Sequence, residues 1–165
     1  MGCRLKHQHD NIYSMLKVTV ISFSFKRGLP DDPTGNGGGF VFDCRAMPNP
    51  FWDETLRGYT GRDRPVADFF ARFPEAVGPF IDAAEALVRQ AVEQYKRDGR
   101  DHLQVAFGCT GGQHRSVYFA ERLAADLINV PGIEVSVSHM ASSYWKTSAK
   151  GSGRLASRST QKEEP

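Results

Sequence analysis

The chain has 165 residues, of which 40% are hydrophobic and 24% charged, and its formal net charge is +2. This length suits one compact domain with short extensions, and the apolar fraction excludes a chain that is disordered throughout. No apolar run approaches the roughly 20 residues that cross a bilayer, and no signal peptide is evident. Three cysteines do not make a disulfide framework. We therefore expect a cytoplasmic protein without a membrane partner.

The positive charge lies at the two ends of the chain. Residues 1–17 carry +2 and residues 141–165 carry +3, whereas residues 18–140 carry −3. Both ends are also polar, so the sequence predicts a disordered leader at 1–16, one domain at 17–140 and a flexible basic tail at 141–165. The acidic balance of the central part disfavours a nucleic-acid-binding protein that is basic throughout.

The first predicted elements are two strands separated by a break. Residues 17–25 alternate and are rich in β-branched and aromatic side chains, and glycines and prolines at 28–39 interrupt them. A short apolar strand follows at 40–44. Residues 45–65 have no regular period, and loops of that length in compact domains usually have a function or are mobile.

Helical spacing begins after Pro65. Apolar residues recur three and four positions apart in a short segment at 66–70 and in a longer one at 77–95. The later elements are a strand at 102–108, a helix at 117–128 and a strand at 133–138. Strands that alternate with helices predict an α/β fold, a single domain with a small, mostly parallel sheet flanked by helices.

The turn between the third strand and the next helix, residues 109–116, has the sequence Cys-Thr-Gly-Gly-Gln-His-Arg-Ser. In open α/β sheets, ligands bind at the carboxyl ends of the strands. The paired glycines let the main chain approach a ligand, and N–H groups at the start of a helix bind anions. Arg115 would add a planar guanidinium that matches two phosphate oxygens, and His114 and Thr110 would add hydrogen bonds. The turn therefore predicts a phosphate site.

The same turn has the spacing Cys-x5-Arg-Ser of cysteine-dependent phosphatases. Cys109 would then be a thiolate nucleophile and Arg115 would hold the phosphate, with Asp43, Asp53 or Asp63 as the acid. Gly108 stands where those enzymes have a histidine. We therefore favour binding without covalent chemistry, with the phosphatase as the alternative and a purely structural turn as a third interpretation.

Five motifs in order resemble the C-terminal domain of the RapZ family of RNase adapter and nucleotide-binding proteins, over about residues 18–140. They are Phe-Ser-Phe-Lys-Arg-Gly-Leu-Pro at 23–30, Phe-Asp-Cys-Arg with Pro-Asn-Pro at 42–50, the segment 56–61, Pro65-Val66, and the segment 108–118. The resemblance implies a phosphofructokinase-like α/β domain that senses glucosamine-6-phosphate or a UDP-amino sugar and binds a small RNA.

The resemblance and the turn together predict the ligand-binding residues, which are Asp43, Cys109, Thr110, Gly111, Gly112, His114 and Arg115. Arg45 and Asn49 are expected at the rim of the site. The candidates for an RNA-binding patch are Lys26, Arg27, Arg57, Arg62 and Arg64, with Tyr59 as a stacking platform. An ordinary solvated face is an equally good interpretation of these scattered cations.

We expect a sensor or adapter domain for a phosphorylated amino sugar or a nucleotide sugar, and no enzyme. The alternatives are the phosphatase that uses Cys109 and Arg115, and an RNA-binding adapter fragment. Full-length members of the family carry Walker motifs in an N-terminal module, and this sequence has none, so we expect no ATP or GTP hydrolysis. A P-loop protein on another chain and a homo-oligomer are the partners left open. No Cys/His set has metal-ligand spacing, so no metal or cofactor is expected.

Overall fold

The computed structural model describes residues 15–35 and 38–147. The predicted leader lies almost wholly outside these residues, and so does the predicted tail from residue 148 onward. The described strands are β1 (Leu16–Ser24), β2 (Gly39–Asp43), β3 (His102–Cys109) and β4 (Ile133–His139). They form one sheet in the order β2-β3-β1-β4, and every neighbouring pair is parallel. The predicted α/β fold is confirmed, and the sheet is parallel throughout.

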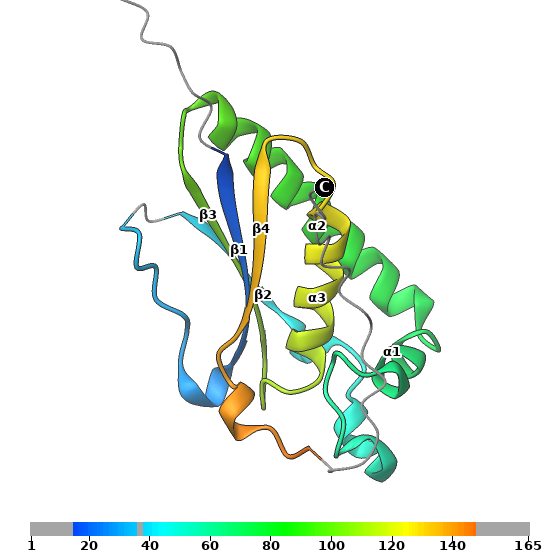
Figure 1. Ribbon diagram of the computed structural model, residues 1–165. Helices are drawn as coiled ribbons and strands as arrows, with labels where there is room; N and C mark the ends of the chain where they lie inside the picture. Colours follow the sequence, from blue (N-terminus) through cyan, green and yellow to red (C-terminus); the bar gives the residue numbers. More distant parts are fainter. Residues whose placement is uncertain (1–14, 36–37, 148–165) are drawn as a thin grey trace, which may run out of the picture.

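The described α-helices cover one face of this sheet (Figure 1). They are α1 (Arg64–Phe70), α2 (Pro74–Arg97) and α3 (Arg115–Leu127). The longest, α2, begins with a proline, which suits the first turn because its missing N–H has no partner there anyway. Lys96 and Arg97 lie in its last turn, where cations offset the negative end of the helix dipole. The result is a two-layer domain.

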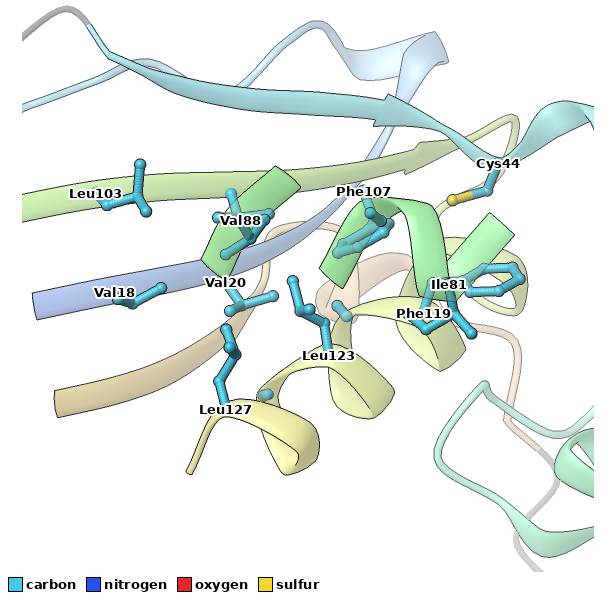
Figure 2. Packing of buried hydrophobic residues seen from close by; sticks show 14 of the residues in the cluster. Val18, Val20, Cys44, Ile81, Val88, Leu103, Phe107, Phe119, Leu123 and Leu127 are labelled. Carbon is cyan, nitrogen blue, oxygen red and sulfur yellow. The ribbon is translucent and has the colours of Figure 1, made fainter. Parts of the chain in front are cut away.

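The core lies between the sheet and the helices. Figure 2 shows Val18 and Val20 of β1, Phe107 of β3, Val88 of α2 and Leu123 of α3 pointing into it, and each of these side chains is fully buried. Burying an aliphatic or phenyl side chain of this size stabilises the fold by about 1.5 to 3 kcal/mol. This cluster holds the sheet and the helices together, and thereby fixes where the strand ends lie.

Three 3-10 helices occupy the stretch for which no regular structure was predicted. Each of them is preceded by a residue whose side chain caps its N-terminus. These helices are η2 (Cys44–Ala46), η3 (Pro50–Trp52) and η4 (Glu54–Leu56). The residue before each is Asp43, Asn49 or Asp53, and its side chain accepts the backbone N–H two positions later, at 2.9 to 3.3 Å. Short polar side chains favour such local bonds. The segment is therefore an ordered loop.

The same loop packs against the start of α3. The amide of Gly61 donates to the carbonyl of Gln113 at 2.8 Å, and a Cβ at Gly61 would collide with the backbone of His114 and Tyr118. Only glycine permits this approach. The loop between β2 and α1 is thereby fixed beside the turn that carries the phosphate-site prediction.

No helix in the described ranges is long and apolar enough to span a bilayer.

Candidate functional site at the carboxyl edge of the sheet

All four strands end at one edge of the sheet, which lies at the bottom of Figure 1. Because neighbouring strands are parallel, their last residues lie in the order of the strands. That order is Asp43 of β2, Cys109 of β3, Ser24 of β1 and His139 of β4. Ligands of open α/β sheets bind at this edge.

The turn after β3 is held in one conformation and exposes two residues. Gly112 has a φ of +69°, a left-handed conformation that other residues rarely adopt. The hydroxyl of Ser24 donates to the carbonyl of Thr110 at 2.7 Å, and the amide of Gly112 donates to the Sγ of Cys109 at 3.2 Å. Thr110 and Gly111 are exposed at the tip. The turn therefore presents its backbone to solvent with little freedom to move.

The thiol of Cys109 lies beneath this turn. The residue is 3% exposed, and its Sγ lies 3.1 Å from the hydroxyl oxygen of Ser116. The amide of Gly112 also donates to this sulfur, at 3.2 Å. The neighbouring Cys44 is fully buried, and burial raises the pKa of its thiol.

Arg115 points under the neighbouring loop. Its guanidinium donates from Nη1 to the carbonyl of Arg45 at 2.8 Å and to that of Met47 at 3.4 Å, and the residue is only 6% exposed. Buried carbonyls without a donor are costly. Arg115 therefore satisfies the backbone of the loop after β2, and any phosphate would use its remaining N–H groups.

Asp43 and Arg45 form an exposed ion pair beside the turn. The Nη2 of Arg45 lies 2.6 Å from Oδ2 of Asp43, and its Nε lies 3.0 Å from Oδ1. This hydrogen bonding from Arg45 lowers the pKa of Asp43, so the carboxylate is charged at neutral pH. The guanidinium of Arg45 also lies 4.0 Å from the ring centre of Phe25. Both carboxylate oxygens of Asp43 accept hydrogen bonds from Arg45, so a ligand would have to exchange with Arg45 to use them.

His114 faces the protein interior. It is 7% exposed, and its Nε2 lies 3.1 Å from the carbonyl of Leu56, which identifies this nitrogen as the donor. Burial lowers the pKa of His114. Its ring therefore ties η4 to the start of α3 in the neutral form.

Gln113 joins this loop to the segment after β4. Its Nε2 donates to the carbonyl of Tyr59 at 2.8 Å, and its Oε1 accepts the amide of Lys146 at 3.0 Å. The indole of Trp145 donates to the carbonyl of Gly112 at 2.8 Å. These contacts were not predicted, because residues from 141 onward were expected to form a tail. The adjacent aromatic residues Tyr144 and Trp145 were the available signal.

Three of the arginines predicted for an RNA-binding patch each have a carboxylate partner. Arg57, Arg62 and Arg64 lie within 3.2 Å of the carboxylates of Glu54, Glu121 and Asp68 respectively. Asn49 caps η3. The ion pairs reduce the positive charge that these arginines offer to an RNA backbone.

Lys26 and Arg27 instead belong to a cavity of about 380 Å³ beside the turn, between β1 and the segment after β4. Its other lining residues are Phe23, Ser24, Gly28, Met140, Ala141 and Tyr144. Within residues 15–35 and 38–147, no group of three or more His, Cys, Asp or Glu side chains is placed to hold a metal ion.

Known proteins resemble this chain over its described part. A family model described as RapZ C-terminal domain matches residues 16–143. A nucleotide-binding protein of Bordetella petrii is 51% identical over 109 residues, which are 66% of this chain and 36% of the relative. Nucleotide-binding proteins of Dinoroseobacter shibae and of a Parafrankia species are 45% and 48% identical, over 76% and 75% of the chain and 39% and 40% of the relatives. The chain thus spans about two fifths of the length of the curated relatives it matches.

Proposed function

Because the chain belongs to the RapZ C-terminal domain family, we propose that it is a non-catalytic domain that binds a phosphorylated ligand at the turn 109–116. The ligand class is a phosphorylated amino sugar or a nucleotide sugar, and the domain acts as a cytoplasmic sensor or adapter that passes the state of this site to a partner. The names of the relatives refer to nucleotide binding, which agrees with an anionic ligand of this kind.

The observation that carries the proposal is the exposed, preorganised backbone of Thr110 and Gly111 at the carboxyl edge of the sheet. Among the described residues, the amide of Gly111 has no hydrogen-bond acceptor. The turn leads directly into α3, whose N-terminal end favours negative charge. Asp43, on the next strand, would accept from a sugar hydroxyl or amino group in exchange for a hydrogen bond from Arg45.

The phosphatase hypothesis stays the second candidate because of the contacts of Cys109. The amide of Gly112 and the hydroxyl of Ser116 both lie within hydrogen-bond distance of its Sγ, at 3.2 and 3.1 Å. Against this hypothesis, the sulfur is nearly inaccessible and Nη1 of Arg115 is occupied by main-chain carbonyls. Turnover of a phosphate ester that is lost in Cys109→Ser would establish it, and an inert purified protein would eliminate it.

A matched pair of variants at Thr110 tests the binding proposal. Thr110→Glu places a carboxylate at the exposed tip and should weaken binding of inorganic phosphate and of glucosamine-6-phosphate at least tenfold. Thr110→Gln has nearly the same shape without the charge and should retain most of the affinity. Gln90→Glu, on the exposed face of α2, controls for net charge. Equal affinities of the two Thr110 variants, or a wild-type chain that binds no phosphate ester in calorimetric titration, would refute the proposal.

A further inference from the structure

Cys44 and Cys109 lie beside one another at the ends of two neighbouring strands. The register of β2 and β3 pairs Phe42 with Phe107, and each cysteine stands two residues further along its chain. Residues two apart share a face of a sheet. The centres of the two phenyl rings are 5.2 Å apart, and both cysteines belong to the same buried core as Phe107. The two thiols therefore face the same side of the sheet from adjacent strand ends.

Both thiols are free and close enough to be joined. Neighbouring strands lie about 4.8 Å apart, and a disulfide joins residues whose Cα atoms are about 4.4 to 6.8 Å apart. Figure 2 shows Cys44 among the side chains of the core. Burial raises the pKa of the Cys44 thiol, and electrostatic repulsion by Cys109 raises it further, as is expected of groups that lie close together. The separation that a disulfide requires is therefore met without moving the strands.

We propose that Cys44 and Cys109 form a reversible disulfide when the protein meets a peroxide, and that this bond weakens anion binding at the turn 109–116. Hydrogen peroxide oxidises the thiol of Cys109 to a sulfenic acid and releases one water. The sulfur of Cys44 then attacks the sulfenic sulfur, and its proton leaves with the sulfenic oxygen as a second water. The two sulfurs together lose two electrons, which the peroxide gains, and a thiol reductant reverses the reaction by exchange.

Cys109 is the thiol that the oxidant reaches first. It lies directly beneath the exposed tip of the turn and is 3% exposed, whereas Cys44 is fully buried. The raised pKa of Cys44 keeps its thiol protonated, and a protonated thiol is a poor nucleophile toward a peroxide. Cys109 therefore becomes the sulfenic acid, and Cys44 is the thiol that resolves it.

A bond to Cys44 would draw the sulfur of Cys109 away from the groups that hold the turn. The amide of Gly112 donates to this sulfur at 3.2 Å, and the hydroxyl of Ser116 lies 3.1 Å from it. Once the sulfur moves toward β2, the amide of Gly112 loses its acceptor, and the backbone of the turn is no longer preorganised. The expected loss of anion affinity rests on the proposed function, whereas the disulfide itself does not.

Peptide mapping without reductant tests the bond directly. The full chain is treated with hydrogen peroxide, its free thiols are blocked with iodoacetamide in denaturant, and it is digested with trypsin, which cleaves after lysine and arginine. The proposed disulfide links the peptide 28–45 to the peptide 101–115, and dithiothreitol separates them. The proposal is refuted if the two peptides stay unlinked, if Cys109 pairs with Cys3 instead, or if Cys109 is oxidised to a sulfinic acid while Cys44 stays free.

Cys44→Val is the matched variant, because a buried free cysteine behaves as a small apolar side chain. It should bind inorganic phosphate like the reduced wild type, and peroxide should leave its affinity unchanged. The oxidised wild type should bind phosphate about three- to tenfold more weakly, as the loss of one hydrogen bond implies, and dithiothreitol should restore the affinity. Cys3→Ser should behave like the wild type in both assays.

The two assays separate the possible failures. Linked peptides with unchanged phosphate affinity would refute the effect of the bond on the turn. If neither the reduced nor the oxidised protein binds phosphate, the proposed function fails, and the peptide map still decides whether the disulfide forms. The map needs no variant, so it tests the bond even if Cys44→Val does not fold.

Discussion

Substituting the two neighbouring glycines of the turn separates folding from ligand contact. Gly112→Ala forces a side chain into a left-handed conformation, with φ at +69°, and places its Cβ 2.7 Å from that of Ala141 and 3.0 Å from that of Ser24. The conformation costs about 1 to 2 kcal/mol, and overpacking adds about 1 to 3 kcal/mol. We expect the free energy of unfolding to fall by about 2 to 4 kcal/mol. Gly111→Ala meets nothing within 4 Å and has no positive φ, so its stability should stay within about 0.5 kcal/mol of the wild type.

Urea-induced unfolding, followed by circular dichroism, measures both variants. For a domain of this size the loss in Gly112→Ala corresponds to a melting temperature about 6 to 15 °C lower. If ligand binds at the exposed tip, Gly111→Ala should change affinity without changing stability. An equally stable Gly112→Ala, or an equal loss in both variants, would show that the turn is not held as the contacts of Ser24 and Ala141 require.

Three further predictions concern the core, the buried histidine and the segment after β4. Phe107→Ala, at a fully buried ring, should lower the free energy of unfolding by about 3 to 5 kcal/mol, whereas Phe51→Ala, at a residue 49% exposed, should cost much less in the same denaturation assay. Burial lowers the pKa of His114, so the unfolded chain takes up a proton before the folded one. Stability should therefore decline as the pH falls below about 6.5 and through the lowered pKa, and His114→Gln should flatten this dependence in denaturation curves between pH 7 and 5. Trp145→Phe removes the donor to Gly112 and should cost about 0.5 to 1.5 kcal/mol in thermal unfolding.

The strands and helices could be predicted because each buries one face, and the spacing of the apolar residues on that face can be read from the local sequence. The strand predicted at 102–108 is β3 with one more residue, and the helix predicted at 117–128 begins two residues earlier, at Arg115. The prediction of a mostly parallel sheet was correct because strands that alternate with helices need crossover connections. The order of the strands depends on contacts between distant segments, and no local pattern encodes it.

The predicted ligand residues show the limit of sequence reasoning about a site. Thr110, Gly111 and Asp43 are exposed at the edge where the sequence places them, whereas His114 and Arg115 donate to main-chain carbonyls. The spacing of a motif fixes where a residue lies on the chain. The direction of its side chain depends on partners, here the carbonyls of an irregular loop, that have no recognisable pattern.

The hydrogen bonds of Arg115 to the loop after β2 limit how this residue can bind an anion at the turn. Its Nη1 satisfies the carbonyls of Arg45 and Met47, and leaving these carbonyls without a donor would cost about 1 to 3 kcal/mol. A ligand that drew the whole guanidinium away would have to offset that loss. In the proposed complex, the backbone of Thr110 and Gly111 therefore supplies most of the hydrogen bonds to the anion. The positive charge of Arg115 adds electrostatic attraction. Arg115→Ala would remove a support of the loop together with that charge, which makes Thr110 the better position at which to test binding.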